Sequence, residues 1–229
     1  MDIATRAPVE GPTFIRLLAR IAGSGGQPSG IAPSQRLGEW IDWTRAIALS
    51  RALEQSPEPP PPPPRGDDPA GEVARARRAL QARIGDREAW EAALADPGEA
   101  GFAGLRKRHV AIQHALQASA GRLRGDLRDR LAAGSPAQAR LAALDAVMEQ
   151  VASPREQQLL AAVPDLLRER HAQLRAAADR DAGDLLAQAV PAGDGGWRAL
   201  CQDMQELLLA ELDVRFMPID GLLAALQSR

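Results

Sequence analysis

Tyrosine is absent from this 229-residue chain, and aromatic residues make up only 3% of it. So few aromatic side chains favour a core of closely approaching helices rich in alanine and leucine over a thick globular interior. Cysteine occurs once, as Cys201, which excludes an intrachain disulfide framework and is typical of a reducing compartment. Lysine also occurs once, as Lys107, among 28 basic residues, a bias that we attribute to genome composition.

An excess of positive charge and long apolar runs are lacking as well. The net charge of −2 gives no overall positive field for nucleic acid or an acidic membrane. Apolar runs such as residues 159–163 and 207–210 are far shorter than the roughly 20 residues of a membrane span. No N-terminal segment has the plan of a signal peptide. We expect a cytoplasmic protein without membrane insertion, whose association with a membrane would be peripheral, through a membrane-protein partner.

Motifs for catalysis and metal binding are missing. His109 and His114 are five residues apart, which does not align them on one helical face, and Cys201 has no partner cysteine for a zinc site. No nucleophile elbow, phosphate-binding loop or dinucleotide fingerprint occurs. His109, Glu169 and His171 remain as candidates for a site without a motif. We predict a non-enzymatic protein with no metal and no cofactor, in which His109 is a hydrogen-bonded core histidine and Cys201 a buried, inert thiol.

Helix-forming sequence is what the chain has in abundance. Alanine, leucine, arginine and glutamate dominate, and β-branched residues are few. Ser135-Pro136 and Ser153-Pro154 each combine an N-cap serine with a proline suited to the first helical position. Gln138 gives a weak capping box after the first serine, and Glu156 a complete one after the second. These pairs predict two helix starts. Because residues 151–153 leave room for only a very tight connection, the alternatives are a sharp corner or a bent, nearly continuous rod.

Two further prolines interrupt apolar patterns near the C-terminus. Pro164 lies inside a helical period, so that either the helix kinks there or a new helix begins there. The last helix is expected to start near Gly195 or Gly196 and to end at Pro218, with Asp220 capping a terminal turn.

The N-terminal part predicts two helices. The first begins with Thr13 as its N-cap, and the second runs from Ser34 to Gln55. The second contains two of the four tryptophans, which makes it the expected aromatic anchor of the core. Trp43 lies off its apolar face, which indicates a wide buried surface or a contact with another element.

Six consecutive prolines occupy residues 59–64 and predict an extended polyproline helix. We favour a semi-rigid spacer over a docking motif for an aromatic groove. The predicted domains are an N-terminal helical pair (1–55), a proline-rich linker (56–69) and a main bundle (70–229). The expected fold is therefore all-α, a bundle of about six to eight helices with one long coiled-coil-like helix.

The best-defined period in the chain spans residues 102–131. Its apolar face contains Phe102, Leu105, His109, Ile112, Leu116, Ala120, Leu123, Leu127 and Leu131. Spacings of three and four continue for about four heptads and slip near Ala120, where a strict coiled coil would have a stutter. Basic residues decorate this helix, whereas residues 199–221 are acidic; the two could pack within one chain or join two copies.

These patterns predict an interaction or adaptor protein that binds a partner protein, or itself as a homodimer. The candidate partner-binding residues are Leu105, Ile112, Leu116, Leu123, Leu127, Arg122, Arg124 and Arg128. The alternative function is binding of nucleic acid by the arginine-rich faces of residues 75–83 and 122–130, which lack interleaved aromatic residues.

Five stretches resemble a family of uncharacterised proteobacterial proteins that is catalogued only as a domain of unknown function. They are GPTFIRLLARIAG (11–23), GEWIDWTRAIALSRAL (38–53), ARLAALDAVMEQ (139–150), REQQLLAAVPDLLRERH (155–171) and DMQELLLAELDVRFMPIDGLLAAL (203–226). The resemblance covers nearly the whole chain and implies no activity. Genes of this family lie beside genes for stator-like membrane proteins and peptidoglycan-binding proteins, which implies a cytoplasmic accessory of an envelope-associated motor-like assembly.

Overall fold

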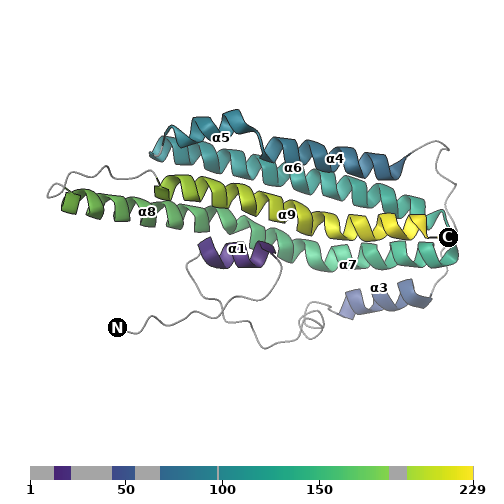
Figure 1. Ribbon diagram of the computed structural model, residues 1–229. Helices are drawn as coiled ribbons and strands as arrows, with labels where there is room; N and C mark the ends of the chain where they lie inside the picture. Colours follow the sequence, from purple (N-terminus) through teal and green to yellow (C-terminus); the bar gives the residue numbers. More distant parts are fainter. Residues whose placement is uncertain (1–12, 22–42, 55–67, 97, 186–194, 229) are drawn as a thin grey trace. The chain divides into compact units, whose positions relative to one another are not determined.

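The computed structural model describes residues 13–21, 43–54, 68–96, 98–185 and 195–228, and these residues form eight α-helices and no strand (Figure 1). The helices are α1 (Thr13–Ile21), α3 (Trp43–Glu54), α4 (Pro69–Ile84), α5 (Arg87–Leu94), α6 (Glu99–Ala132), α7 (Pro136–Ala161), α8 (Val163–Leu185) and α9 (Gly195–Gln227). The predicted all-α helical bundle is confirmed. Among the described residues, no helix is both long and apolar enough to cross a bilayer.

The helices group into two compact units. Of the described residues, unit 1 comprises 13–21, 80–96, 98–115, 162–185 and 195–212, and unit 2 comprises 43–54, 68–79, 116–161 and 213–228. Helix α1 packs on α8 in unit 1, whereas α3 packs on α7 in unit 2. The two described helices of residues 1–55 belong to different units, and the predicted domain boundaries stay a prediction. Residues 56–67 of the predicted linker lie outside the described residues, so its role stays a prediction.

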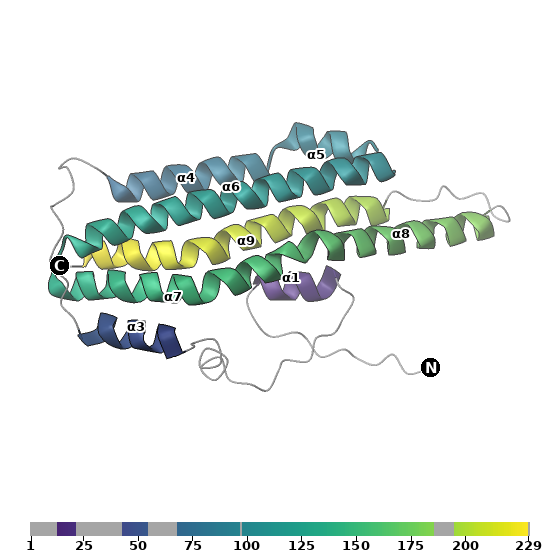
Figure 2. The ribbon, with the colours of Figure 1, turned by 180° about the vertical axis from the view of Figure 1, so that it is seen from behind.

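Unit 1 places the first half of α9 between α6 and α8, as Figures 1 and 2 show. A chain of ring contacts joins these helices. Phe102 of α6 stacks on His171 of α8 with 4.4 Å between ring centroids, and His171 meets the ring of Trp197 of α9 at 5.4 Å. The indole N–H of Trp197 donates to the carbonyl of Ala93 in α5 at 3.0 Å. Aromatic residues thus anchor unit 1 although they are few.

Trp43, the described tryptophan of the second predicted helix, does not serve as that anchor. Trp43 is 80% exposed at the start of α3, so the wide buried surface inferred from its position is wrong. Trp40 lies outside the described residues. Trp90 and Trp197, both of unit 1, are the buried tryptophans among the described residues.

Unit 2 places the end of α9 between α6 and α7, with α3 on the outer side of α7 (Figure 1). Arg77 of α4 lies over the ring of Phe216 of α9 at 4.7 Å and bonds both carboxylate oxygens of Asp220 at 2.7 Å. The side-chain amide of Gln138 in α7 donates to the carbonyl of Ala225 in α9 at 2.9 Å. Unit 2 is thus held by polar contacts around an apolar interior.

The apolar face predicted for residues 102–131 is confirmed as the core of α6. All nine predicted residues are buried, and Ala120, where the spacing slips, is the most exposed of them at 8%. A small side chain at the slip fits the stutter that the period predicts.

The helix start predicted at Ser135 is confirmed, with Pro136 as the first helical residue of α7. The hydroxyl of Ser135 accepts from the backbone N–H of Gln138 at 3.3 Å, and the amide oxygen of Gln138 accepts from the N–H of Ser135 at 3.0 Å. Reciprocal bonds of this kind form a capping box.

The second predicted start, at Ser153-Pro154, is wrong, and the continuous rod is what forms. Helix α7 runs through Pro154 without a break. Proline removes one backbone hydrogen bond, but Val151 and Leu160 on either side are buried. Their burial in unit 2 offsets the lost bond.

Pro218 likewise lies inside α9, so the predicted helix end there and the cap at Asp220 are wrong. Phe216 and Ile219 beside it are fully buried, which holds the helix together across the proline. Pro164, in contrast, lies in the first turn of α8. The carbonyl of Ala162 accepts from the N–H groups of Asp165 and Leu166, so a new helix begins there and the kink alternative is excluded.

Replacing Gly104 with alanine is expected to raise the free energy of unfolding by about 0.5–1 kcal/mol. An ideal Cβ at this position in the interior of α6 would meet no atom within 4 Å, so alanine gains helix propensity without a clash. Gly101 is the matched control, because its Cβ would overlap the main-chain oxygen of Asp96 and Gly101→Ala should destabilise. Urea unfolding of both variants checks this; a less stable Gly104→Ala would contradict it.

Candidate functional site on helix α6

Three consecutive cations, Arg106, Lys107 and Arg108, form a basic ridge on α6 in unit 1. Each residue of a helix is rotated by about 100° from the one before it, so Arg106 and Arg108 lie on opposite sides with Lys107 between them. Leu105 and His109 on either side of the ridge in sequence are buried. The core face of α6 therefore fixes the direction of the ridge.

A groove of about 520 Å³ lies on the Arg106 side, and we call it the α6–α8 groove. It is lined by Glu99, Phe102, Ala103, Arg106, Lys107 and Val110 of α6 and by Arg168 of α8. The floor is apolar, because Phe102 is a core residue and Ala103 and Val110 present small aliphatic side chains. The rim carries three cations, so the groove offers an apolar floor between positive edges.

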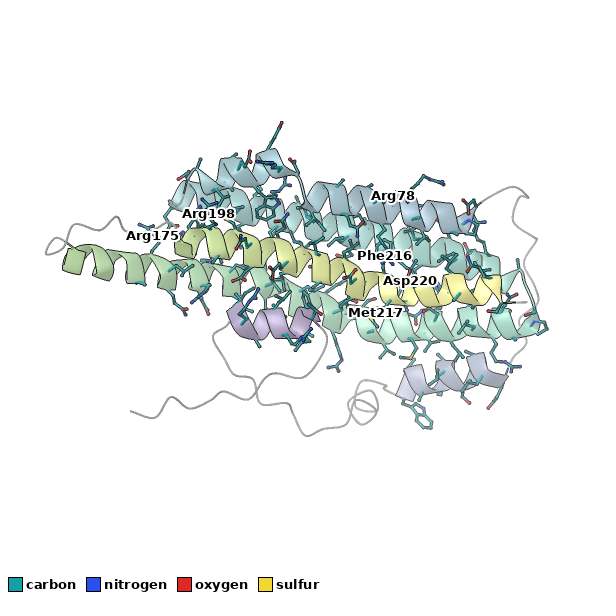
Figure 3. All side chains as sticks on the ribbon, viewed as in Figure 1. Arg78, Arg175, Arg198, Phe216, Met217 and Asp220 are labelled. Atoms are coloured by element: carbon teal, nitrogen blue, oxygen red, sulfur yellow. The ribbon has the colours of Figure 1, made fainter. Side chains whose placement is uncertain are left out.

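Carboxylates near this groove compensate only part of its charge. Arg168 is paired with Asp165, whose carboxylate lies 4.0 Å from Arg106. Arg175, which projects from α8 (Figure 3), pairs with Glu99 at 2.7 Å. Together with Lys107, these residues place four cations against two carboxylates. The groove therefore has a local excess of positive charge in a chain whose net charge is −2.

A second hollow, of about 310 Å³, lies on the Arg108 side. Its lining consists of Arg83, Gly104, Lys107, Arg108, Ala111 and Ile112. Arg108 has a structural role here: it donates to the carbonyl of Arg83 at 2.8 Å, lies 3.6 Å from Asp86, and its guanidinium is 5.6 Å from the centre of the Trp90 ring. It thus satisfies a carbonyl at the end of α4.

Lys107 lines both hollows, is exposed, and has no ion-pair partner among the described residues. This cation distinguishes the ridge from the rest of α6. A second set of positions off the core face, Ala103, Lys107 and Val110, is spaced by four and three residues. That spacing is the signal in the sequence from which the groove could have been found.

None of the sequence-predicted partner-binding residues lines the α6–α8 groove, and Ile112 is the one that lines the hollow beside Arg108. Leu105, Ile112, Leu116, Leu123 and Leu127 are all 2% exposed or less. The structure therefore places these five apolar residues in the core, where the folded chain leaves them no surface for a partner. Any partner-binding surface of α6 must be made by other residues.

The predicted arginines belong to an ion-paired cluster in unit 2. Arg124 bonds Asp145 of α7 through two nitrogens at 2.7 and 2.8 Å, and Arg128 bonds both Asp145 and Glu149. Burial alone would lower the pKa of Arg124, but the hydrogen bonds and the charge of Asp145 outweigh it, so this pKa is raised. Arg122 pairs with Glu72 at 2.7 Å and with Asp126 at 3.0 Å.

A polar hollow of about 350 Å³ adjoins this cluster. It is lined by Gln117, Ala118, Ala120, Gly121, Arg124, Glu149, Ser153, Glu156, Gln157, Arg215 and Pro218. Arg215 pairs with Glu156 at 2.8 Å. Because Arg124, Arg128 and Arg215 face three carboxylates, the cluster has no charge left over for a phosphate or an acidic partner.

A model of a protein family of unknown function, DUF3348, matches residues 1–228. The chain belongs to this family. The predicted resemblance to a domain-of-unknown-function family is thereby confirmed. No curated protein and no solved structure matches the chain. The comparisons therefore supply the family but no activity, ligand or partner.

His109 and His171 of unit 1 are buried, but they differ in their surroundings. His171 is held between Phe102 and Trp197. His109 is 1% exposed, and neither of its ring nitrogens has a hydrogen-bond partner among the described residues, so the predicted hydrogen-bonded state is wrong. Burial lowers the pKa of His109 to about 4. Glu169 is exposed, and none of these three residues lines the α6–α8 groove or the hollow beside Arg108.

Cys201 is buried in α9, as predicted. Burial raises the pKa of its thiol to about 11, against a smaller opposing effect of Arg198. The thiol is therefore protonated near neutral pH, which is the state of an unreactive cysteine. In the described residues no group of histidine, cysteine and carboxylate side chains is arranged to hold a metal ion.

Proposed function

We propose that this protein is a non-enzymatic helical interaction protein that binds an acidic segment of a partner protein on its basic ridge. The observation that carries the proposal is Lys107, an exposed cation without a described ion-pair partner between two hollows. The other two cations of the ridge, Arg106 and Arg108, already lie close to carboxylates. A partner carboxylate at Lys107 would find a charge that the fold leaves uncompensated.

The shape of the α6–α8 groove supports a helical partner segment. Its lining on α6 runs from Glu99 to Val110, which is about three turns of helix. An amphipathic helix binds such a groove with its apolar residues on the floor and its charged residues at the rim. Acidic residues flanking an apolar residue would match Ala103 on the floor and Lys107 and Arg168 at the rim.

Binding of nucleic acid, the alternative function predicted from the sequence, has less support than binding of an acidic protein segment. Arg122, Arg124 and Arg128 of the second predicted basic face already pair with carboxylates. A phosphate backbone would have to displace those partners, and it needs no apolar groove floor. A cytoplasmic location belongs to our proposal, and a membrane-protein partner would supply the envelope association that the family resemblance implies.

Exchanging the charge of Lys107 tests the proposal. We expect Lys107→Glu to recover a bound partner at about one tenth of the wild-type level or less, because attraction becomes repulsion at the ridge. Lys107→Arg keeps the charge and should recover the partner fully. Arg78, an exposed cation of α4 without a described ion-pair partner, gives the matched control Arg78→Glu (Figure 3).

The measurement is affinity purification of the tagged full chain, at equal expression, from cells that naturally produce it. Quantitative mass spectrometry then compares the proteins recovered with each variant. Recovery of the same proteins in the same amounts with Lys107→Glu and the wild type would overturn the proposal. An equal loss with Arg78→Glu would also overturn it, because the effect would then belong to net charge and not to the ridge.

A further inference from the structure

Helix α9 presents an exposed strip of acidic and apolar residues, namely Asp213, Val214, Met217 and Asp220, which we call the acidic strip. These positions are separated by one, three and three residues, so they share one side of the helix. Val214 is 37% exposed and Met217 is 67% exposed, although Phe216 and Ile219 beside them are fully buried. Figure 3 shows Met217 and Asp220 on the same half of α9.

The two carboxylates of the acidic strip differ in their ion pairing. Asp213 is exposed and has no ion-pair partner among the described residues. Asp220 is bonded by Arg77 but remains about half exposed. Met217 lies between them, four residues after one carboxylate and three residues before the other. An exposed methionine is an adaptable apolar contact, and its flexible side chain suits a shallow groove.

The strip and the α6–α8 groove are complementary in sign, polarity and length. The strip spans eight residues, whose first and last lie about 10 Å apart along the helix, and the groove lining on α6 spans twelve, about 16 Å from first to last. The strip places an apolar side chain between two carboxylates. The groove combines an apolar floor, which includes Ala103, with the cations Lys107 and Arg168.

Resting on the function proposed above, we infer that the α6–α8 groove of one copy of this chain binds the acidic strip of a second copy. Met217 of the second copy lies on the floor of the groove, and Asp213 and Asp220 face the cations of the rim. The groove and the strip are different surfaces, so the contact is heterologous. It covers both the exposed methionine and the uncompensated lysine.

Charge exchange between the two surfaces tests this inference with the full chain. Lys107→Glu and Asp213→Lys each place like charges in contact, and each should weaken self-association about tenfold or more. The double variant Lys107→Glu/Asp213→Lys restores opposite charges and should return association to about the wild-type level. Arg78→Glu is the control, and it should leave association unchanged.

Sedimentation equilibrium at low salt measures the association of each variant, and circular dichroism shows that the helices are intact. Association of the wild type should also weaken as salt is added, because rim charges are screened. A wild type that stays monomeric at all concentrations tested would overturn the inference. So would single variants that associate as well as the wild type, or a double variant that fails to recover.

The failure of the inference can be separated from the failure of the proposed function. A monomeric wild type that still recovers a foreign partner through Lys107 would overturn docking of a second copy alone. If neither self-association nor partner recovery changes when the charge of Lys107 is reversed, both the inference and the proposed function would be overturned.

Discussion

Replacing Leu116 with alanine is expected to lower the free energy of unfolding by about 2–5 kcal/mol, and replacing it with aspartate should unfold the chain. Leu116 has no exposed surface and lies in the middle of the buried face of α6. Alanine leaves a cavity, and aspartate buries an unpaired charge. Urea unfolding followed by circular dichroism measures the first effect, and the loss of helical signal in buffer measures the second.

Leu159 provides the matched control for this experiment. It is a leucine of α7 that is 68% exposed, so Leu159→Asp should change stability by less than about 0.5 kcal/mol. A folded Leu116→Asp that loses only the ability to bind a partner would contradict the core assignment. The same outcome would restore the apolar face of α6 as a partner-binding surface.

Replacing His109 with leucine is expected to stabilise the protein at pH 7 by about 1–3 kcal/mol. His109 is buried, and neither ring nitrogen has a described hydrogen-bond partner. The native state therefore bears the desolvation cost of a polar ring without compensation. His114, which is exposed on the same helix, gives the matched control His114→Leu, which should have a much smaller effect on stability at pH 7.

The same variant should also change how stability depends on pH. Burial lowers the pKa of His109 to about 4 in the folded state, against an ordinary value near 6.5. Between these values the unfolded chain binds the proton and the folded chain does not, so stability falls as the pH falls from about 6.5 to 4. The loss attributable to His109 amounts to about 3 kcal/mol and ends below pH 4.

Urea unfolding at intervals from pH 7 to pH 4 measures this difference. The advantage of His109→Leu over the wild type should grow steadily as the pH falls through this range. A constant difference between the two proteins over the whole range would contradict a buried, neutral His109.

The helices of the main bundle could be predicted from the sequence where the apolar period was strong. The face of residues 102–131 repeats over about eight turns, and tertiary packing agrees with it at every position. Ser135 was recognised because its cap depends only on residues of the next turn.

The effect of the prolines on the helices was harder to predict, because it depends on the burial of neighbouring residues. Pro154 and Pro218 carry local signals for the start and the end of a helix, yet both lie inside long helices. The neighbouring Val151 and Phe216 are buried in unit 2. Packing of such residues outweighs the loss of one backbone hydrogen bond, and no local pattern shows that burial.

The candidate site could be predicted only in part. The sequence showed that α6 is rich in arginine, but it could not show which cations have partners. Asp145 compensates Arg124 from the next helix, and Asp165 lies near Arg106 from α8. Lys107 is distinguished only by the absence of such a partner among the described residues, which is a property of the folded arrangement.

Carbodiimide crosslinking at Lys107 tests the central claim most directly. Carbodiimide joins a lysine amine to a carboxylate in contact with it, and Lys107 is the only lysine of the chain. Lys107→Arg keeps the charge but cannot form the amide. Treatment of the native complex should give a crosslink from Lys107 to an aspartate or glutamate of the bound partner, found by mass spectrometry and absent from Lys107→Arg. A bound partner without any crosslink at Lys107 would contradict the account.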